Sequence, residues 1–152
     1  MYLNIGDSAP DFELLNYDST LINSSSLKGE KHIIWFFPKA NTPGWTVQGC
    51  GFRDEFKKFK ERNIEIIGVS ADPVSKQEKF VEKYNFPYLM LCDESKEMLQ
   101  SYKAWGLKKF MGREYEGIHR ISYLIDEKGF IEKVFDKVKT KSHAIDVLNE
   151  IS

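Results

Sequence analysis

The sequence has little cysteine, no long apolar run and no excess of charge of either sign. Its 152 residues include only two cysteines, Cys50 and Cys92, which are too few for a disulfide framework and belong to no Cys/His cluster with zinc spacing. No window approaches the ~20 apolar residues that a membrane helix needs. The 22 basic and 23 acidic residues nearly balance, so the charge does not indicate nucleic acid or an anionic membrane as a partner.

The N-terminus also lacks the features of a secretory signal. The opening "MYLNIGDSAPDF" has no basic segment and no apolar run. We see no internal repeat, low-complexity tract or interdomain linker. Apolar residues make up 41% of the chain, which is enough for a packed core without covalent crosslinks. We therefore expect a single domain over residues 1–152, soluble and cytoplasmic, in which the thiols stay reduced.

Short apolar runs alternate with segments of helical periodicity in the first half of the chain. The runs 32–37 and 64–70 are nearly continuous in apolar residues, which is typical of strands buried on both faces of a sheet. Between them, the segment 46–62 places three phenylalanines on one helical face: Phe52, Phe56 and Phe59. The order predicts a strand, a helix and a second, parallel strand.

Two further helices and a strand are predicted in the middle of the chain. One helix has Asp72 as its expected N-cap and Pro73 as its first residue. A short strand follows at 88–92. The next helix, over 95–106, is expected to close at Gly106.

The C-terminal part has a different order of elements. The strand-like runs 120–126 and 130–135 flank the turn residues "EKG", which indicates a β-hairpin, and 142–152 is an amphipathic helix. Parallel strands followed by an antiparallel pair predict an α/β fold with a mixed central sheet flanked by helices, in a thioredoxin-like arrangement. A flavodoxin-like sheet is the alternative, but the glycine-rich phosphate-binding loop after the first strand is missing.

The break between the strand that ends at Phe37 and the helix that starts near Thr46 is the expected functional site. Ligands of open α/β sheets bind beyond the carboxyl ends of the strands. A helix N-terminus there offers free backbone N–H groups and the positive end of the helix dipole. A thiol at position 45 would have its pKa lowered from about 8.5 into a reactive range. The sequence, however, has Trp45 at this position.

The segment "FFPKANTPGWTVQGCGFRDEF" closely resembles the active-site segment of peroxiredoxins, and is most similar to the bacterioferritin comigratory protein group, also called PrxQ. The family pattern Pro-x-x-x-Thr-x-x-Cys is matched by Pro38, Thr42 and position 45. The resemblance covers essentially the whole chain. Its other matching segments are "GDSAPDFEL" at 6–14, "GVSAD" at 68–72 and "GIHRISYLIDEKGFIEKVF" at 117–135.

This resemblance implies a thiol-dependent peroxidase that reduces hydrogen peroxide and organic hydroperoxides. In the family, a peroxidatic thiolate, here at position 45, attacks a peroxide oxygen and becomes a sulfenic acid. The resemblance assigns Thr42 to orienting the thiolate and the peroxide, and Arg120 to stabilising the thiolate and the leaving oxygen. Pro38 would shield the pocket from water. Cys50, five residues after the peroxidatic position, would be the resolving cysteine.

The resemblance also implies the partners. Thioredoxin or a similar dithiol would reduce the 45–50 disulfide, and no metal, haem or flavin would be needed. Members of this group are often monomers, and we expect a monomer here. Residues five apart on a helix are separated by roughly 7.5 Å of rise, whereas a disulfide needs Cα atoms about 4.4–6.8 Å apart. The first turns of the helix would therefore have to unwind during the cycle.

Trp45 departs from the family pattern at the nucleophile itself. Indole does not attack peroxide at a useful rate, and its bulk should fill or distort a pocket built around a thiol. Three interpretations follow. In the first, Trp45 replaces a cysteine or selenocysteine, whose codons each differ from the tryptophan codon by one base. The peroxidase is then otherwise complete, because it retains Pro38, Thr42, Cys50 and Arg120. Alternatively, the chain is a catalytically dead binding or chaperone-like module. The third interpretation makes Cys50 the redox thiol, which requires an exposed side chain with a lowered pKa.

The remaining candidate residues have simpler explanations. Cys92 ends a predicted strand and is expected to be a buried small apolar residue. His119 is expected to be structural. Trp105 and Phe110 are expected in the core or at the rim of the pocket. Arg53 is expected to pair with its neighbour Asp54 at the surface.

Overall fold

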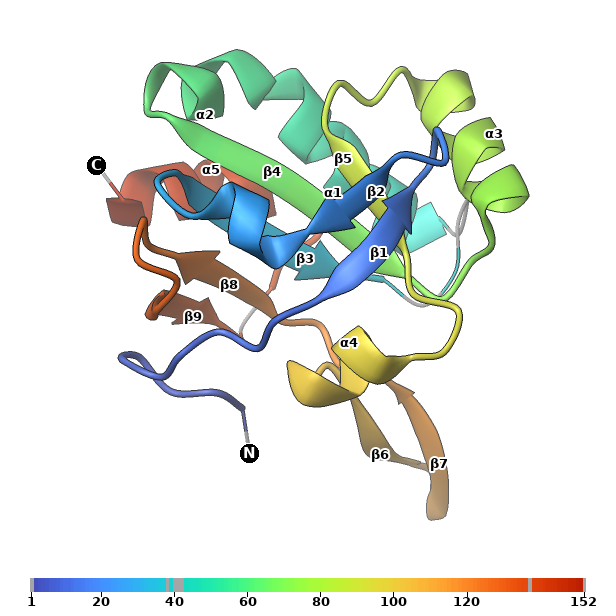
Figure 1. The fold of residues 1–152 in the computed structure, drawn as a ribbon. Coiled ribbons are helices and arrows are strands. Elements are labelled where there is room, and N and C mark those ends of the chain that lie inside the picture. Colours follow the sequence, from blue (N-terminus) through green and yellow to red (C-terminus); the bar gives the residue numbers. More distant parts are fainter. Residues whose placement is uncertain (1, 38, 40–42, 137, 152) are drawn as a thin grey trace.

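The computed structural model describes residues 2–37, 39, 43–136 and 138–151, with the side chains of Pro43 and Phe110 outside the description. Figure 1 shows the arrangement of the elements around a central sheet. In chain order they are β1 (Glu13–Asn16), β2 (Leu21–Asn23), η1 (Ser24–Leu27), β3 (Lys31–Phe36), α1 (Pro43–Asp54), α2 (Phe56–Glu61), β4 (Ile64–Ser70), α3 (Val74–Tyr84), β5 (Leu89–Cys92), α4 (Glu97–Ser101), β6 (Trp105–Phe110), β7 (Arg113–Ile118), β8 (Ser122–Ile125), β9 (Ile131–Phe135) and α5 (His143–Ile151).

The main sheet has the strand order β2-β1-β5-β4-β3-β8-β9. Strand β4 pairs in parallel with β3 and β5, whereas β8 and β9 continue the sheet as antiparallel strands. The predicted mixed sheet and its closing hairpin are thereby confirmed. The sheet does not begin with parallel strands, however, because β1 and β2, which were not predicted, form an antiparallel pair, and β1 also pairs antiparallel with β5. The carboxyl ends of β3 and β4 meet at one edge of the sheet, and the segment leading to α1 leaves from that edge.

Three predicted helix boundaries are wrong. The expected helix over 46–62 is divided into α1 and α2 at Glu55, whose φ of −100° and ψ of 6° leave the helical region. Pro73 is the N-cap of α3 in place of Asp72, because the Asp72 carboxylate accepts a hydrogen bond from the Ser70 hydroxyl at 2.8 Å. Helix α4 ends at Ser101 and does not reach Gly106.

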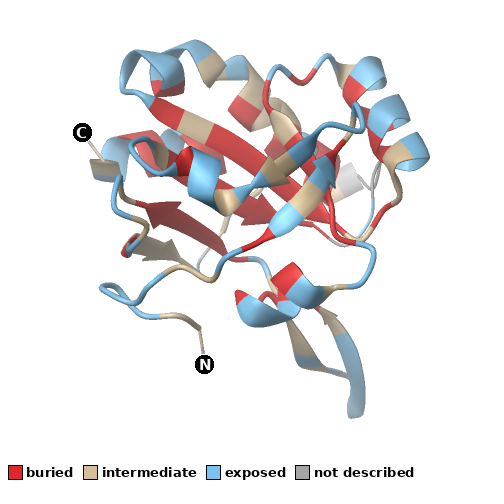
Figure 2. Cartoon of the chain, viewed as in Figure 1, coloured by how far each residue is buried: buried red, intermediate tan, exposed pale blue. Residues whose placement is uncertain are grey.

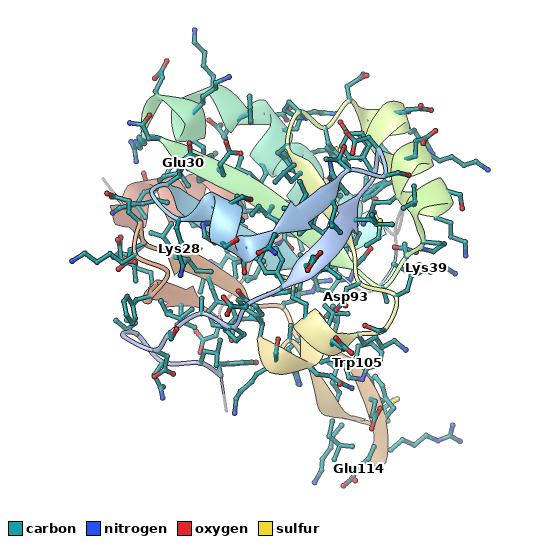
Figure 3. All side chains as sticks on the ribbon, viewed as in Figure 1. Lys28, Glu30, Lys39, Asp93, Trp105 and Glu114 are labelled. Carbon is teal, nitrogen blue, oxygen red and sulfur yellow. The ribbon has the colours of Figure 1, made fainter. Side chains whose placement is uncertain are left out.

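The strands β6 and β7 form a separate two-stranded sheet that projects from the body (Figure 1). Gly106, predicted to close a helix, lies in β6 opposite Gly117 of β7. Trp105 lies at the base of this hairpin and Glu114 near its far end (Figure 3). Figure 2 shows buried residues concentrated in the central strands and exposed residues over the hairpin.

An aromatic layer joins the sheet to α1. Trp35 of β3 is fully buried and stacks on Phe37 and on Phe52 of α1, with ring centroids 4.8 and 5.7 Å apart respectively. A Cβ atom at Gly49 of α1 would lie 3.1 Å from both Trp35 and Phe86, so glycine is what allows the helix to approach this closely. Aromatic contacts of this kind stabilise by about 0.5–1.5 kcal/mol each beyond the burial of their area. The packing fixes the height of α1 above the sheet.

Two buried histidines should make the fold sensitive to acid. Burial lowers the pKa of His32 and of His143 from 6.5 to about 4. Between pH 6.5 and 4 the unfolded chain takes up protons that the folded chain does not, so the free energy of unfolding falls as the pH falls. Each histidine contributes on the order of 3 kcal/mol to this loss. We expect urea unfolding of His143→Gln to show a shallower pH dependence than the parent over this range, and equal slopes would contradict the assignment.

Candidate active site

Trp45 lies in the first turn of α1, beyond the carboxyl end of β3. This first turn contains no acidic side chain, so the positive end of the helix dipole is not neutralised from within the helix. The helix begins at Pro43, three residues before the predicted start near Thr46, and residue 45 lies where the helix N–H groups and dipole would favour an anion. Pro38 and Thr42, the two other motif residues of this segment, lie outside the described residues.

The indole of Trp45 is buried and contacts Arg120. Only 8% of the residue is exposed, and it is part of the main apolar core. The guanidinium carbon of Arg120 lies 4.5 Å from the centre of the ring, which is a cation–π contact. A Cβ at Gly44 would lie 3.1 Å from the Arg120 Nη2 atom, so the absent side chain at Gly44 lets the guanidinium approach the helix N-terminus. The structure therefore brings Trp45 and Arg120 together from opposite halves of the sequence.

Arg120 covers Trp45 from the solvent side. Arg120 itself is exposed and lies in the connection between β7 and β8, residues 119–121. His119 beside it donates its backbone N–H to the Ala104 carbonyl and packs edge-on against Tyr2 at 6.0 Å. These contacts give His119 the structural role that was expected of it. The exposed charge lies over the aromatic face because an indole attracts a cation that still keeps contact with water.

Cys50 lies in the second turn of α1 and is only partly exposed. Burial raises the pKa of its thiol, the Arg53 charge lowers it by a smaller amount, and the charge of Asp54 raises it. Arg53 and Asp54 form the expected ion pair, with Nε and Oδ1 3.1 Å apart. The net direction is opposite to what a reactive thiolate needs, which argues against Cys50 as an independent redox centre. Cys92 is buried, as predicted, and burial raises its pKa to about 12.

The raised pKa leads to a labelling prediction. We expect iodoacetamide to alkylate Cys50 more slowly than free cysteine at pH 7, with the rate levelling off at a higher pH than that of free cysteine, because only the thiolate reacts. The variant Cys50→Ser should take up almost no label while folded, since Cys92 is only 7% exposed. Alkylation of Cys50 at the rate of free cysteine would restore the interpretation in which this thiol alone carries redox chemistry.

Two hydrogen bonds that hold α1 could not be predicted from the sequence. The Tyr88 hydroxyl donates a hydrogen bond of 2.8 Å to the Gly49 carbonyl, and Arg53 Nη1 donates one of 2.7 Å to the Tyr84 carbonyl. Tyr84 is the last residue of α3, and Tyr88 lies in the connection from α3 to β5. Periodicity cannot indicate such contacts, because they depend on how α1 lies over the sheet.

Neither a metal site nor a membrane span is found in the part of the chain that the structure describes. Within residues 2–37, 39, 43–136 and 138–151, no three His, Cys, Asp or Glu side chains are placed to hold a metal ion. Over the same ranges, none of the helices combines the length and the apolar character needed to cross a membrane.

Comparison with known proteins identifies the family. The model of the AhpC/TSA family matches residues 5–134. Peroxiredoxin Bcp of Escherichia coli (strain K12) is 43% identical over 147 residues, which cover 97% of this chain and 94% of the relative. Peroxiredoxin Bcp of Bacillus subtilis (strain 168) is 40% identical over 151 residues, covering 99% and 96%.

Solved structures agree with this result. A mutant of PrxQ from Xylella fastidiosa superimposes with a TM-score of 0.92 at 27% identity, covering 99% of this chain and 96% of the other. Peroxidoxin BcpB from Mycobacterium tuberculosis gives a TM-score of 0.85 at 30% identity, covering 97% and 96%. The predicted thioredoxin-like fold and the predicted family activity, thiol-dependent peroxide reduction, are confirmed. The chain belongs to the AhpC/TSA family, among the peroxiredoxins of the Bcp and PrxQ group.

Proposed function

We propose that position 45 is the peroxidatic position of this peroxiredoxin, and that Trp45 blocks an otherwise complete site. The observation that carries the proposal is the contact between Trp45 at the N-terminus of α1 and the Arg120 guanidinium, 4.5 Å from the ring centre. The helix dipole and the arginine together form an electropositive place that would stabilise a thiolate. In this chain the electron-rich face of an indole takes the place of that anion.

With a thiol at position 45, the residues support the following chemistry. The thiolate attacks one oxygen of a hydroperoxide, the O–O bond breaks, and a sulfenic acid forms while the leaving oxygen takes up a proton. Arg120 stabilises the charge on the thiolate and on the leaving oxygen. We assign orientation of the peroxide to Thr42 and exclusion of water to Pro38, on the strength of the motif alone. Cys50 then attacks the sulfenic sulfur and releases water.

The substrate and the reductant follow from the family. Hydrogen peroxide and organic hydroperoxides are the proposed substrates; a relative, the bacterioferritin comigratory protein of Xanthomonas campestris, is described by its alkyl peroxide reduction activity. A thioredoxin-type dithiol is the proposed reductant, because it would return a 45–50 disulfide to two thiols. We propose that the chain acts as a monomer, without a cofactor, in the cytoplasm.

The test is peroxide consumption in a thioredoxin-coupled assay, run on this chain and on Trp45→Cys in parallel. Turnover by the cysteine variant alone supports the proposal. Turnover by neither variant supports a catalytically dead binding module, which is favoured by one observation: large apolar side chains are exposed on the β6–β7 hairpin. Their exposed fractions are 58% for Leu107, 89% for Met111 and 46% for Tyr115. Equal turnover by both would assign the chemistry to Cys50 and overturn the assignment of position 45.

A further inference from the structure

Residues 84–88, which comprise the last residue of α3 and its connection to β5, hold α1 on both sides of Cys50. We infer that this segment is a clamp whose two hydrogen bonds, from Tyr88 and to the Tyr84 carbonyl, control how readily Cys50 leaves the helix. Tyr88 and Arg53 are then positioning residues for the resolving step. This inference deepens the proposed function and rests on it for the role of Cys50.

The first bond of the clamp holds the residue before Cys50. The Tyr88 hydroxyl donates to the Gly49 carbonyl at 2.8 Å, and only 4% of Tyr88 is exposed. Burial raises the pKa of the phenol well above its usual value, so the hydroxyl keeps its proton and remains a donor. Phe86 of the same connection lies within van der Waals reach of Gly49, where a Cβ would be 3.1 Å from its ring. Breaking a buried hydrogen bond is costly if its donor and acceptor are left unpaired.

The second bond of the clamp lies one turn further along α1. Arg53 Nη1 donates to the Tyr84 carbonyl at 2.7 Å. Cys50 thus lies between two anchored residues, Gly49 on one side and Arg53 on the other. The segment that anchors them is itself fixed, because Asn85 caps α3 in a left-handed conformation and its N–H is bonded to the Val81 carbonyl.

The clamp opposes the motion that the resolving step needs. On an intact helix, positions 45 and 50 are roughly 7.5 Å apart in rise, which is too far for a disulfide, so this part of α1 must unwind. Moving Cys50 toward position 45 displaces Gly49, its immediate neighbour, and breaks the bond to Tyr88. In that step the Cys50 sulfur bonds to the sulfenic sulfur, the S–O bond breaks, and the hydroxyl leaves as water with the thiol proton. Weakening the clamp should therefore accelerate this step.

The opening of α1 can be measured on the chain as it stands, by hydrogen exchange of the amides in residues 44–54. A net hydrogen bond corresponds to about a fivefold to tenfold change in an opening equilibrium. We expect Tyr88→Phe to increase α1 exchange by this factor. The matched control is Tyr102→Phe, which removes the hydroxyl of another buried tyrosine, bonded at 2.7 Å to the Pro10 carbonyl, away from α1.

A second pair of variants tests the other bond. Arg53→Gln should also increase α1 exchange, whereas Arg62→Gln removes a 2.7 Å bond to the Leu148 carbonyl and should leave α1 within twofold of the parent. If neither Tyr88→Phe nor Arg53→Gln changes α1 exchange by more than twofold, or if the controls change it equally, the clamp does not exist. This result would not depend on peroxidase activity.

The resolving role is tested in the Trp45→Cys background by stopped-flow mixing with one equivalent of hydrogen peroxide. We expect Tyr88→Phe to accelerate disulfide formation about fivefold to tenfold, while the second-order rate of sulfenic acid formation stays unchanged. A general loss of structure would slow both steps, so the split distinguishes positioning from simple destabilisation. Unchanged disulfide formation would overturn the role of the clamp. Failure of Trp45→Cys to react with peroxide would overturn the proposed function and leave the exchange result standing.

Discussion

The variant Trp45→Cys is expected to consume peroxide with thioredoxin at least about a thousandfold faster than the parent chain, which should show no turnover above background. The reason is that the parent lacks the atom that attacks the peroxide, and removal of a covalent nucleophile commonly costs many powers of ten in rate. The rest of the predicted site stays in place: the helix N-terminus, Arg120 and Cys50. Initial rates over a range of hydroperoxide concentrations measure the change directly.

Two control variants separate the thiol from the space that it needs. Trp45→Ser opens the same space without a nucleophile and should remain inactive. Trp45→Cys combined with Cys50→Ser should form a sulfenic acid, detectable by dimedone capture and mass spectrometry, but should turn over poorly with thioredoxin. Robust turnover of the serine variant would show that position 45 is not the nucleophile.

The gain in activity is expected to come with a loss of stability. Trp45 is 8% exposed and packs in the core, so a cysteine there leaves space that the surroundings only partly fill. Truncation of a buried tryptophan typically costs about 3–5 kcal/mol. Circular dichroism at the assay temperature must therefore confirm that Trp45→Cys is folded before a low rate is interpreted.

The sequence predicted the parts of the fold that carry strong local patterns. Strands β3 and β4 are continuous apolar runs, and both were placed within one residue of their observed ends. The β8–β9 hairpin followed from two apolar runs around the turn residues "EKG". Such patterns are local, because burial on both faces of a sheet requires apolar side chains at every position.

The β6–β7 hairpin was missed because its sequence does not alternate. Its two-residue turn is formed by Met111 and Gly112, with φ angles of 51° and 80°. A turn of this kind normally favours Asn-Gly, and methionine rarely adopts a left-handed conformation. Side chains on both strands are exposed, so the hairpin also lacks the alternation of apolar and polar residues that marks a strand with one buried face.

The site was predictable only in part, because some of its contacts join residues that are distant in the sequence. A helix shortly after the buried strand β3 was predicted from local patterns, so the approximate place of Trp45 could be derived locally, although α1 begins at Pro43 and not near Thr46. The position of Arg120 over the ring could not, because the two residues are distant in sequence, and the resemblance to the family supplied it. The hydrogen bond between Tyr88 and Gly49 was indicated neither by a local pattern nor by the family resemblance, since it depends on how α1 packs against the residues that precede β5.

Replacing Arg120 by methionine in the Trp45→Cys background is expected to lower the second-order rate constant for peroxide by about a hundredfold to a thousandfold. This is the usual cost of removing one group that stabilises developing charge in a transition state. Methionine has a similar length and no charge, so the thiolate at position 45 loses its cationic neighbour. Its pKa should rise, and the pH at which the reaction reaches half its maximal rate should rise with it.

Arg120→Lys and the parent background provide the controls. Lysine keeps the charge but loses the planar fork that binds two oxygens at once, so the rate should lie between those of arginine and methionine, with a smaller shift in pH dependence. In the parent chain, Arg120→Met should lower the free energy of unfolding by only about 1 kcal/mol, because an exposed cation–π contact is weak. A large effect on rate beside a small effect on stability identifies a residue that acts on the reacting atoms. If the effects on the rate constant and on the free energy of unfolding are both small, Arg120 only covers Trp45, and another cation must stabilise the thiolate.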